Sequence, residues 1–348
     1  MLLSYIPYAL EFIHPFAVFG NTRLRTPSIM VKIESEGYTG YGEACLPPYL
    51  GETVGDTIAF LKRATKVLNT ATPEMGLELL LLMLKPYMSA DYAGMAAVEM
   101  ALNDLFARFE GKSFRAWKGF NTGISRDTAH TIGIGDLEQL PGKIKEAEEF
   151  STLKIKLGTK RDREIIEFIR QHTQKPLYVD VNQGWKNKEE ALELMIWLHS
   201  QNVVLVEQPM PIGMKDEMIW LTERSPIPTI ADESVRRMHE LRALNGSYAG
   251  INIKLMKSTG LGEALRMIEY AKNKGLKVML GCMAESSCAT TAMAQLMEFA
   301  DFIDLDAPLL YKNDPFTGLT YKHGKIVLND LPGLGVAPKP GLFENSLI

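Results

Sequence analysis

The chain has 348 residues, of which 46% are hydrophobic and 23% charged, and its formal net charge is −4. This length predicts one large barrel or two domains, and the mildly acidic charge argues against a nucleic-acid partner or an anionic membrane surface. Three cysteines without metal-type spacing, and no apolar stretch as long as a bilayer span, favour a soluble cytoplasmic protein without membrane contact.

Residues 1–115 predict an α+β capping domain. The stretch SIMVKIESEGYTGYGEA favours two strands around a turn near Glu36 and Gly37, because both flanks are β-rich and the turn contains glycine. Two later stretches, GETVGDTIAFLKRATKVL and AGMAAVEMALNDLFARFEGKSF, have the apolar spacing of amphipathic helices. We expect the C-terminal segment, about 315–348, to return and complete this domain.

Residues 116–314 change rhythm, because short apolar β-rich runs alternate with longer helical patterns. Such alternation predicts a parallel sheet with right-handed crossovers, and eight strands about 25 residues apart favour a closed barrel. No full helix is expected after the last strand, so the fold class is α/β, a modified TIM barrel of (β/α)7β type. The expected strands are 129–135, 152–158, 177–182, 203–208, 228–234, 250–255, 277–281 and 301–306.

Charged residues recur at the expected carboxyl ends of five successive strands. They are Lys156, Asp180, Glu207, Asp232 and Lys254, separated by 24, 27, 25 and 22 residues. Because the carboxyl ends of parallel barrel strands carry the catalytic side chains, this phase predicts five charges at one height, pointing inward.

The three acids of this series favour a metal site. Asp180, Glu207 and Asp232 offer hard oxygen ligands from three neighbouring strands, which suits one Mg²⁺ with positions left for substrate. No histidine joins them, which argues against zinc. The alternative is three strand-end carboxylates paired with surface lysines, which the common phase disfavours.

The lysines flank the acids on both sides. Lys154 lies two residues before Lys156, so both point to the same side of their strand, and we expect each ammonium to lower the pKa of the other. With Lys254 opposite, one base could remove an α-proton and the other return a proton to the opposite face. The alternative is that these lysines extend from strand ends to water.

A second acidic pair lies in the last expected strand, FIDLDAPLL. Asp304 and Asp306 are two residues apart and therefore project from one face of that strand. Each carboxylate raises the pKa of the other unless a positive group joins them. The pair therefore predicts a site for a cation.

Five ordered motifs, LKIKLG, DVNQGW, VEQP, ADES and NIKLMKSTG, resemble the signatures of the muconate-lactonizing subgroup of the enolase superfamily. A lysine base working with Mg²⁺ on an ene-diolate is the established pattern of that superfamily. The resemblance implies Mg²⁺ ligation by Asp180, Glu207 and Asp232 and an acid/base pair of Lys156 and Lys254. It also implies that Lys154 assists Lys156 and contacts the substrate carboxylate.

Within the subgroup, DLDAP resembles the element by which dipeptide epimerases hold the α-ammonium group of the substrate, here Asp304 and Asp306. GCMAES resembles the matching specificity loop, with Glu285 at its acidic position. Ala-Glu epimerases of the family bind the distal glutamate carboxylate with a cap-loop arginine, for which GNTRLRTPS offers Arg23 and Arg25. Further expected substrate contacts are Thr131, Asn182 and Asn252.

These observations favour an isomerase, a Mg²⁺-dependent dipeptide epimerase that inverts the α-carbon of the C-terminal residue by two-base 1,1-proton transfer. L-Ala-D/L-Glu is the favoured substrate, and the resemblance suggests peptidoglycan recycling and assembly into homo-oligomers. The alternatives are an epimerase of hydrophobic dipeptides, an o-succinylbenzoate synthase or cycloisomerase of the same superfamily, a metal-dependent barrel hydrolase and a non-catalytic binding barrel. The hydrolase would leave the opposed lysines without a role.

Overall fold

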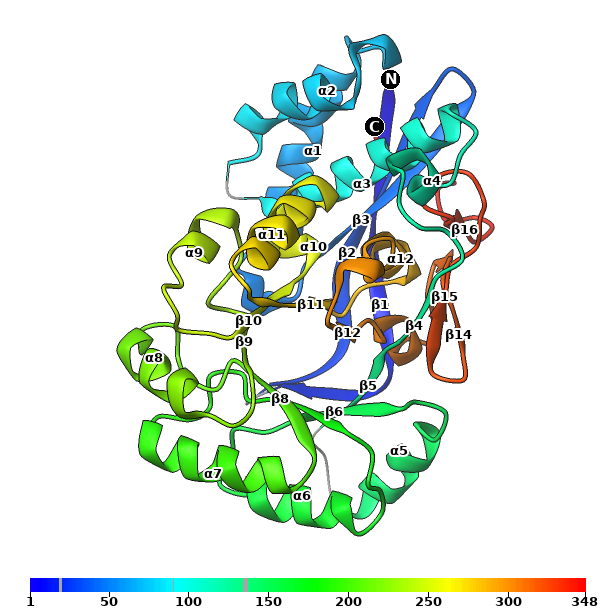
Figure 1. Cartoon of the computed structure of the whole chain (residues 1–348). Helices are drawn as coiled ribbons and strands as arrows, with labels where there is room; N and C mark the ends of the chain where they lie inside the picture. The colour runs from blue at the N-terminus through cyan, green and yellow to red at the C-terminus, as the bar shows by residue number, and fades with distance from the viewer. Residues whose placement is uncertain (19–20, 90, 134–136) are drawn as a thin grey trace.

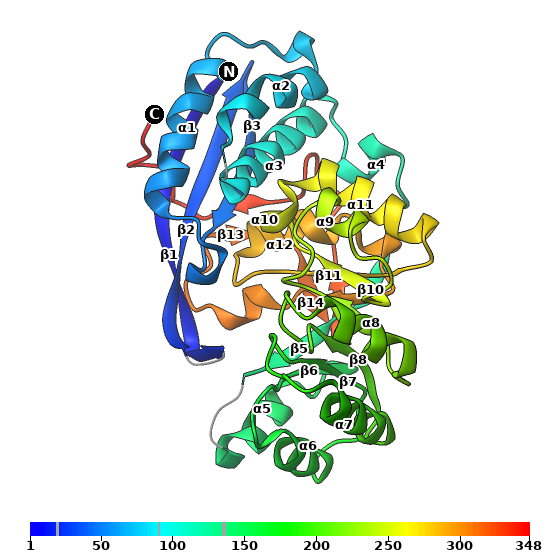
Figure 2. The same cartoon turned by 90° about the vertical axis from the view of Figure 1, so that its left-hand side faces the viewer.

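The computed structural model describes residues 1–18, 21–89, 91–133 and 137–348. The N-terminal strands and helices lie beside the open mouth of a barrel formed by the rest of the chain (Figures 1 and 2). No helix in the described part of the chain has the length and apolar character needed to cross a membrane.

An antiparallel sheet of order β1-β2-β3 forms the centre of the N-terminal unit. β2 and β3 are joined by the expected turn, where Glu36 and Gly37 have φ of 51° and 82°. The long helix α3 packs on β3, so close that glycine is required at Gly40 and Gly42. The bounds are β1 Leu2–Val18, β2 Asn21–Ser35, β3 Tyr38–Cys45, α1 Val54–Leu68, α2 Leu77–Leu84, α3 Tyr92–Phe109 and α4 Phe114–Lys118.

The first strand was not predicted. Pro7 and Glu11 interrupt the apolar run of β1, and proline removes a backbone donor from a sheet. β1 pairs only with β2 within its three-stranded sheet, so it is an edge strand, where proline is tolerated. Its apolar side chains Leu3, Tyr5 and Leu10 are buried.

Eight parallel strands form the second sheet, in the order β12-β11-β10-β9-β8-β7-β6-β5, which is sequence order reversed. This arrangement confirms the predicted (β/α)7β class. The expected end of the first barrel strand, 134–135, lies outside the described residues. The bounds are β5 Ala129–Ile132, β6 Thr152–Lys156, β7 Leu177–Asp180, β8 Val203–Glu207, β9 Thr229–Ala231, β10 Gly250–Ile253, β11 Lys277–Gly281 and β12 Phe302–Asp304.

The helices cover the outside of these strands (Figure 1). The amphipathic α6, for example, buries Ile165, Ile166 and Ile169. After β12 the described chain forms no further α-helix, as expected. A short 3-10 turn over Ala307–Leu310 follows instead. The bounds are α5 Leu140–Glu146, α6 Asp162–Arg170, α7 Lys188–Ser200, α8 Lys215–Arg224, α9 Met238–Arg242, α10 Leu255–Ser258, α11 Leu261–Asn273 and α12 Ser287–Ala294.

The C-terminal segment returns along the outside of the molecule. β14 (Thr320–Lys322) and β15 (Lys325–Val327) form the expected hairpin, and β4 (Ser125–Asp127) pairs with β15. Further on, β16 (Ala337–Pro338) pairs with β13 (Phe316–Thr317), and Leu347 exchanges two backbone hydrogen bonds of 2.8 Å with Tyr5 of β1. The domain limits at 115 and 314 stay a prediction.

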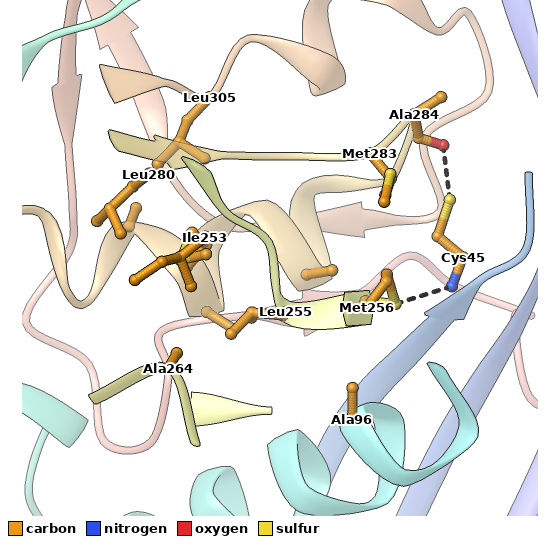
Figure 3. Packing of buried hydrophobic residues seen from close by; sticks show 14 of the residues in the cluster. Cys45, Ala96, Ile253, Leu255, Met256, Ala264, Leu280, Met283, Ala284 and Leu305 are labelled. Atoms are coloured by element: carbon orange, nitrogen blue, oxygen red, sulfur yellow. Dashed lines mark hydrogen bonds between the residues drawn. The ribbon is translucent and has the colours of Figure 1, made fainter. Parts of the chain in front are cut away.

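The end of β3 contacts the barrel directly. The backbone N–H of Cys45 lies 3.3 Å from Met256 Sδ, and its Sγ donates to the carbonyl of Ala284 at 3.0 Å (Figure 3). Two residues before Cys45 in β3, the buried carboxylate of Glu43 accepts hydrogen bonds from the N–H and the hydroxyl of Ser286. Ser286 directly precedes α12. These contacts fix the cap over the barrel mouth.

Candidate active site

A cavity of about 580 Å³ lies where the carboxyl ends of the barrel strands face the loops of the cap. Active sites of such barrels lie at this end. The predicted residues that line the cavity are Arg23, Thr131, Lys154, Lys156, Asn182, Asp232, Lys254, Asp304 and Asp306.

The three predicted metal ligands lie on adjacent strands. Asp180 and Glu207 stand opposite each other in the β7–β8 register and are fully buried, and Asp232 directly follows β9 and is 5% exposed. Asn252 Nδ2 donates a hydrogen bond to Glu207 Oε1 at 2.7 Å, which fixes one oxygen of this carboxylate. The barrel therefore gathers three carboxylates from three adjacent strands.

Lys154 extends into this group of acids. Its Nζ lies 2.7 Å from Glu207 Oε2, 2.6 Å from Asp304 Oδ2 and 3.3 Å from Asp180 Oδ2. Burial lowers the pKa of this lysine, but Asp304, Glu207 and Asp180 outweigh burial and raise it well above its ordinary value. The expected lowering of this pKa by Lys156 was wrong, because carboxylates are the nearer neighbours.

Lys156 and Lys254 stand on opposite sides of the acids. Lys156 Nζ contacts Asp180 Oδ2 at 2.5 Å, and Lys254 Nζ contacts Asp232 Oδ2 at 2.8 Å. Lys156 ends β6 and Lys254 directly follows β10, so the three acid-bearing strands β7, β8 and β9 lie between them. Both lysines line the cavity.

A fourth lysine, Lys257, was not singled out from the sequence. Its buried Nζ lies 2.6 Å from Asp232 Oδ1 and 2.9 Å from the carbonyl of Asn252. Burial opposes ionisation of Asp232, but Lys254 and Lys257 outweigh it and hold the pKa of that carboxyl well below its ordinary value. The spacing of three residues from Lys254, on the first turn after β10, was the available signal.

Buried negative charge remains incompletely balanced. Burial and the neighbouring Asp180 raise the pKa of Glu207 to about 7, and burial and Asp232 raise that of Glu233. Among the described residues, no three acidic, histidine or cysteine side chains form a preassembled metal cage. Lysine ammonium groups occupy the space between the carboxylates instead. The donor set itself, all carboxylate oxygen, fits Mg²⁺.

Asp304 and Asp306 are both buried and both line the cavity. Asp304 Oδ1 is buried and has no hydrogen-bond partner among the described residues, whereas Oδ2 takes Lys154. Thr131 donates its N–H to Asp306 Oδ2 at 2.5 Å and its hydroxyl to Oδ1 at 3.3 Å. Burial and Asp304 raise the pKa of Asp306, as expected for this member of the pair.

Arg23 and Arg25 were expected on a loop of the cap, but both lie in strand β2, and they differ in position. Arg23 lines the cavity, and both of its Nη atoms are buried without a hydrogen-bond partner among the described residues. Arg25 is exposed on β2, opposite Glu11 in the β1–β2 register. Glu285 is buried, and it is not one of the described residues that line the cavity. Burial and Glu43 raise the pKa of Glu285 well above its ordinary value.

Two opposed lysines, with buried carboxylates on the strands between them, lie at the carboxyl ends of the strands of a (β/α)7β barrel. The family model described as "Enolase C-terminal domain-like" matches residues 139–342. The chain belongs to this family.

Named relatives agree with this assignment. The chain is 44% identical to the L-Ala-D/L-Glu epimerase of Bacteroides thetaiotaomicron over 337 residues, which cover 97% of this chain and 88% of the relative. It is 34% identical to an L-Ala-D/L-amino acid epimerase of Flavobacterium johnsoniae, over 94% of this chain and 97% of the relative. Relatives of this kind are isomerases, and the protein is an isomerase of the enolase superfamily.

Solved structures give the same fold. The substrate-liganded L-Ala-D/L-Glu epimerase of Bacillus subtilis has a TM-score of 0.90 and 27% identity, covering 97% of this chain and 98% of that one. A dipeptide epimerase of Enterococcus faecalis complexed with Mg and the dipeptide L-Leu-L-Tyr has a TM-score of 0.90 and 26% identity, covering 97% and 99%.

Proposed function

We propose that this protein is a Mg²⁺-dependent dipeptide epimerase that inverts the α-carbon of the C-terminal residue, with L-Ala-D/L-Glu as substrate. The observation that carries the proposal is the placement of Lys156 and Lys254 on opposite sides of one cavity, with three buried carboxylates on the strands between them. A substrate α-carbon between the two lysines could lose a proton to the neutral amine of one and gain a proton from the ammonium of the other on the opposite face.

Asp180, Glu207 and Asp232 are the proposed Mg²⁺ ligands. Their support is chemical: all three are buried carboxylates, and burial together with Asp180 raises the pKa of Glu207 to about 7. When bound, Mg²⁺ would supply positive charge that stabilises the enediolate formed by loss of the α-proton. The proposed role of Lys154, whose Nζ contacts Glu207 and Asp180, is to bind the substrate carboxylate.

Asp304 and Asp306 are the proposed site for the α-ammonium group of the dipeptide. The free Oδ1 of Asp304 is a buried acceptor on the cavity wall, and such an oxygen is costly to leave unpaired. Thr131 holds Asp306 in place through two hydrogen bonds. Substrates of cycloisomerases and of o-succinylbenzoate synthases carry no ammonium group, so this pair favours dipeptides.

Arg23 supports an acidic side chain at the C-terminal position of the dipeptide. A buried guanidinium whose Nη atoms have no partner among the described residues can form a bidentate pair with a carboxylate. The cavity also contains Ile212 and Leu310, which would suit a hydrophobic dipeptide. Arg23 is the observation that supports the acidic class in this proposal.

The test compares Arg23→Met with Arg25→Met, a matched control two residues along the same strand. We expect Arg23→Met to lower kcat/KM for L-Ala-L-Glu by about 100-fold while it spares L-Ala-L-Leu, since one charged hydrogen-bonded contact contributes about 2–3 kcal/mol. Arg25→Met should change kcat/KM for neither substrate. Wild-type preference for L-Ala-L-Leu over L-Ala-L-Glu would overturn the acidic assignment and leave a hydrophobic dipeptide epimerase.

The proposed pathway is the recycling of peptidoglycan. Peptidoglycan recycling in the cytoplasm would be consistent with a preference for Ala-Glu, as the name of the Bacteroides relative suggests. Deleting the gene in its host should cause L-Ala-D-Glu to accumulate in soluble cell extracts, measured by mass spectrometry. Unchanged dipeptide levels would contradict this role.

A further inference from the structure

Tyr49 lies beside the one cap-loop arginine that lines the cavity. It is the middle residue of a 3-10 turn, Pro48–Leu50, in the loop between β3 and α1. The guanidinium carbon of Arg23 lies 5.2 Å from the centre of the Tyr49 ring, within the range of a cation–π contact. Neither Nη atom of Arg23 has a hydrogen-bond partner among the described residues, so the ring contacts a guanidinium whose Nη donors are unpaired there.

The ring is itself tethered to the barrel. The Tyr49 hydroxyl lies 3.3 Å from Met283 Sδ, in the loop that follows β11. Tyr49, Arg23 and Met283 all line the cavity. The tyrosine thus joins three segments that are far apart in sequence: the β1–β2 hairpin, the loop before α1 and a barrel loop.

This contact has a consequence for binding. A free arginine side chain has many rotamers, and fixing it when a ligand binds costs affinity. A guanidinium that already lies against a ring loses less freedom on binding, and a ring does not compete with a carboxylate for the N–H donors. Tyr49 therefore leaves the Nη donors of Arg23 available while it limits the directions in which they point.

We propose that Tyr49 is a positioning residue that sets the preference for an acidic C-terminal side chain by holding Arg23 over the cavity. This inference rests on the proposed dipeptide epimerase function and on the role assigned there to Arg23. Tyr49 acts through Arg23, so its loss should affect acidic substrates selectively and leave proton transfer at the α-carbon unaltered.

The experiment measures kcat/KM for L-Ala-L-Glu and for its neutral isostere L-Ala-L-Gln, and takes their ratio. We expect Tyr49→Leu to lower this ratio by about 2- to 5-fold, the range of a cation–π contact at a ring that is 53% exposed, mainly through KM for the acidic substrate. Tyr49→Phe keeps the ring and should keep the ratio. Tyr87 is half-exposed and is not one of the described residues that line the cavity. Tyr87→Leu should therefore leave kcat/KM for both substrates unchanged.

The outcomes separate this inference from the function on which it rests. Equal kcat/KM of the wild type for the two dipeptides would refute the acidic preference itself. If the wild type prefers L-Ala-L-Glu and Arg23→Met abolishes that preference, but Tyr49→Leu retains it, only the role of Tyr49 is refuted. A Tyr49→Phe variant as impaired as Tyr49→Leu would also overturn it, because the hydroxyl and not the ring would then be required. Should Tyr49→Leu fail to fold by circular dichroism, Tyr49→Met carries the same expectation.

Discussion

Lys154 Nζ lies 2.6 Å from Asp304 Oδ2 and so joins the second barrel strand to the eighth across the cavity floor. The same ammonium lies 2.7 Å from Glu207 Oε2. One lysine therefore links a proposed metal ligand to the proposed ammonium site. The cavity has a continuous charged floor, along which a dipeptide with an ammonium at one end and a carboxylate at the other could align.

Replacing Asp304 by asparagine should weaken the binding of free dipeptides. The substitution removes one carboxylate from the proposed ammonium site, and we expect KM for L-Ala-L-Glu to rise at least 10-fold, since charged contacts of this kind contribute about 1.5–3 kcal/mol. Steady-state kinetics with N-acetyl-L-Ala-L-Glu provide the comparison. That substrate lacks the ammonium group, so the wild type should use it poorly and Asp304→Asn should show no further loss. An unaltered KM for the free dipeptide would argue against the assignment.

Metal removal should stop turnover. We expect EDTA treatment to abolish epimerisation and added Mg²⁺ to restore it, because three buried carboxylates need a cation in the proposed mechanism. Isothermal titration calorimetry should show one Mg²⁺ per chain, with affinity lowered at least 10-fold in Glu207→Gln. Glu189→Gln, on the surface of α7, is the matched control. Full activity in EDTA would contradict the metal role.

Glu99 should make stability fall as pH rises. Burial raises the pKa of this carboxyl from 4.5 to about 7 in the folded protein. A raised folded pKa means that the folded state binds the proton more tightly, so this contribution to stability is fully present below pH 4.5 and is lost as pH rises through 7. We expect Glu99→Gln to gain about 2 kcal/mol relative to the wild type between pH 5 and pH 8 in urea unfolding.

The isosteric amide is suited to this test because Glu99 Oε1 accepts a 2.7 Å hydrogen bond from the N–H of Gly262, which the amide oxygen of glutamine can retain. The same substitution at exposed Glu110, at the end of α3, is the control. A stability difference between Glu99→Gln and wild type that stays constant with pH would show that the carboxyl does not titrate in this range.

The contact between β3 and α3 should tolerate no side chain at Gly42. A Cβ there would lie 2.0 Å from the backbone carbonyl oxygen of Ala97, which cannot move without displacing the helix. We expect Gly42→Ala to cost at least ~3 kcal/mol in thermal or urea unfolding. Gly55→Ala, in α1, meets only Thr53 Oγ1 at 3.7 Å and should be neutral or stabilising. Equal stability of the two variants would refute the close packing.

The phase of the strand ends made the barrel and much of its site predictable. Lys156, Asp180, Glu207 and Asp232 recur once per strand–helix unit, and a parallel barrel places such positions at one height. The sequence therefore indicated which charges would meet. It could not indicate that Lys154 would lie among three carboxylates, because that depends on side-chain distances across the barrel, and its pKa was consequently predicted in the wrong direction.

The sequence did not predict features that depend on contacts between segments far apart in the chain. β1 carries Pro7, and only its edge position in the sheet makes that residue compatible with a strand. Arg23 and Arg25 are equivalent in sequence, yet one lines the cavity and the other is exposed. Tyr49 acquires its place only because the cap loop meets Arg23 and Met283 from two other segments. None of these relations has a local sequence signal.

The central claim is that Lys156 and Lys254 each transfer a proton on one face of the same α-carbon. It is tested by incubating L-Ala-L-Glu and L-Ala-D-Glu separately in D₂O with the wild type, Lys156→Met and Lys254→Met, and following deuterium incorporation and stereochemistry by NMR. We expect the wild type to epimerise and deuterate both, and each variant to lose epimerisation by at least ~1000-fold. Each variant should still exchange the α-proton of the one epimer that faces its remaining lysine. Epimerisation at the wild-type rate in either variant would contradict the two-base account.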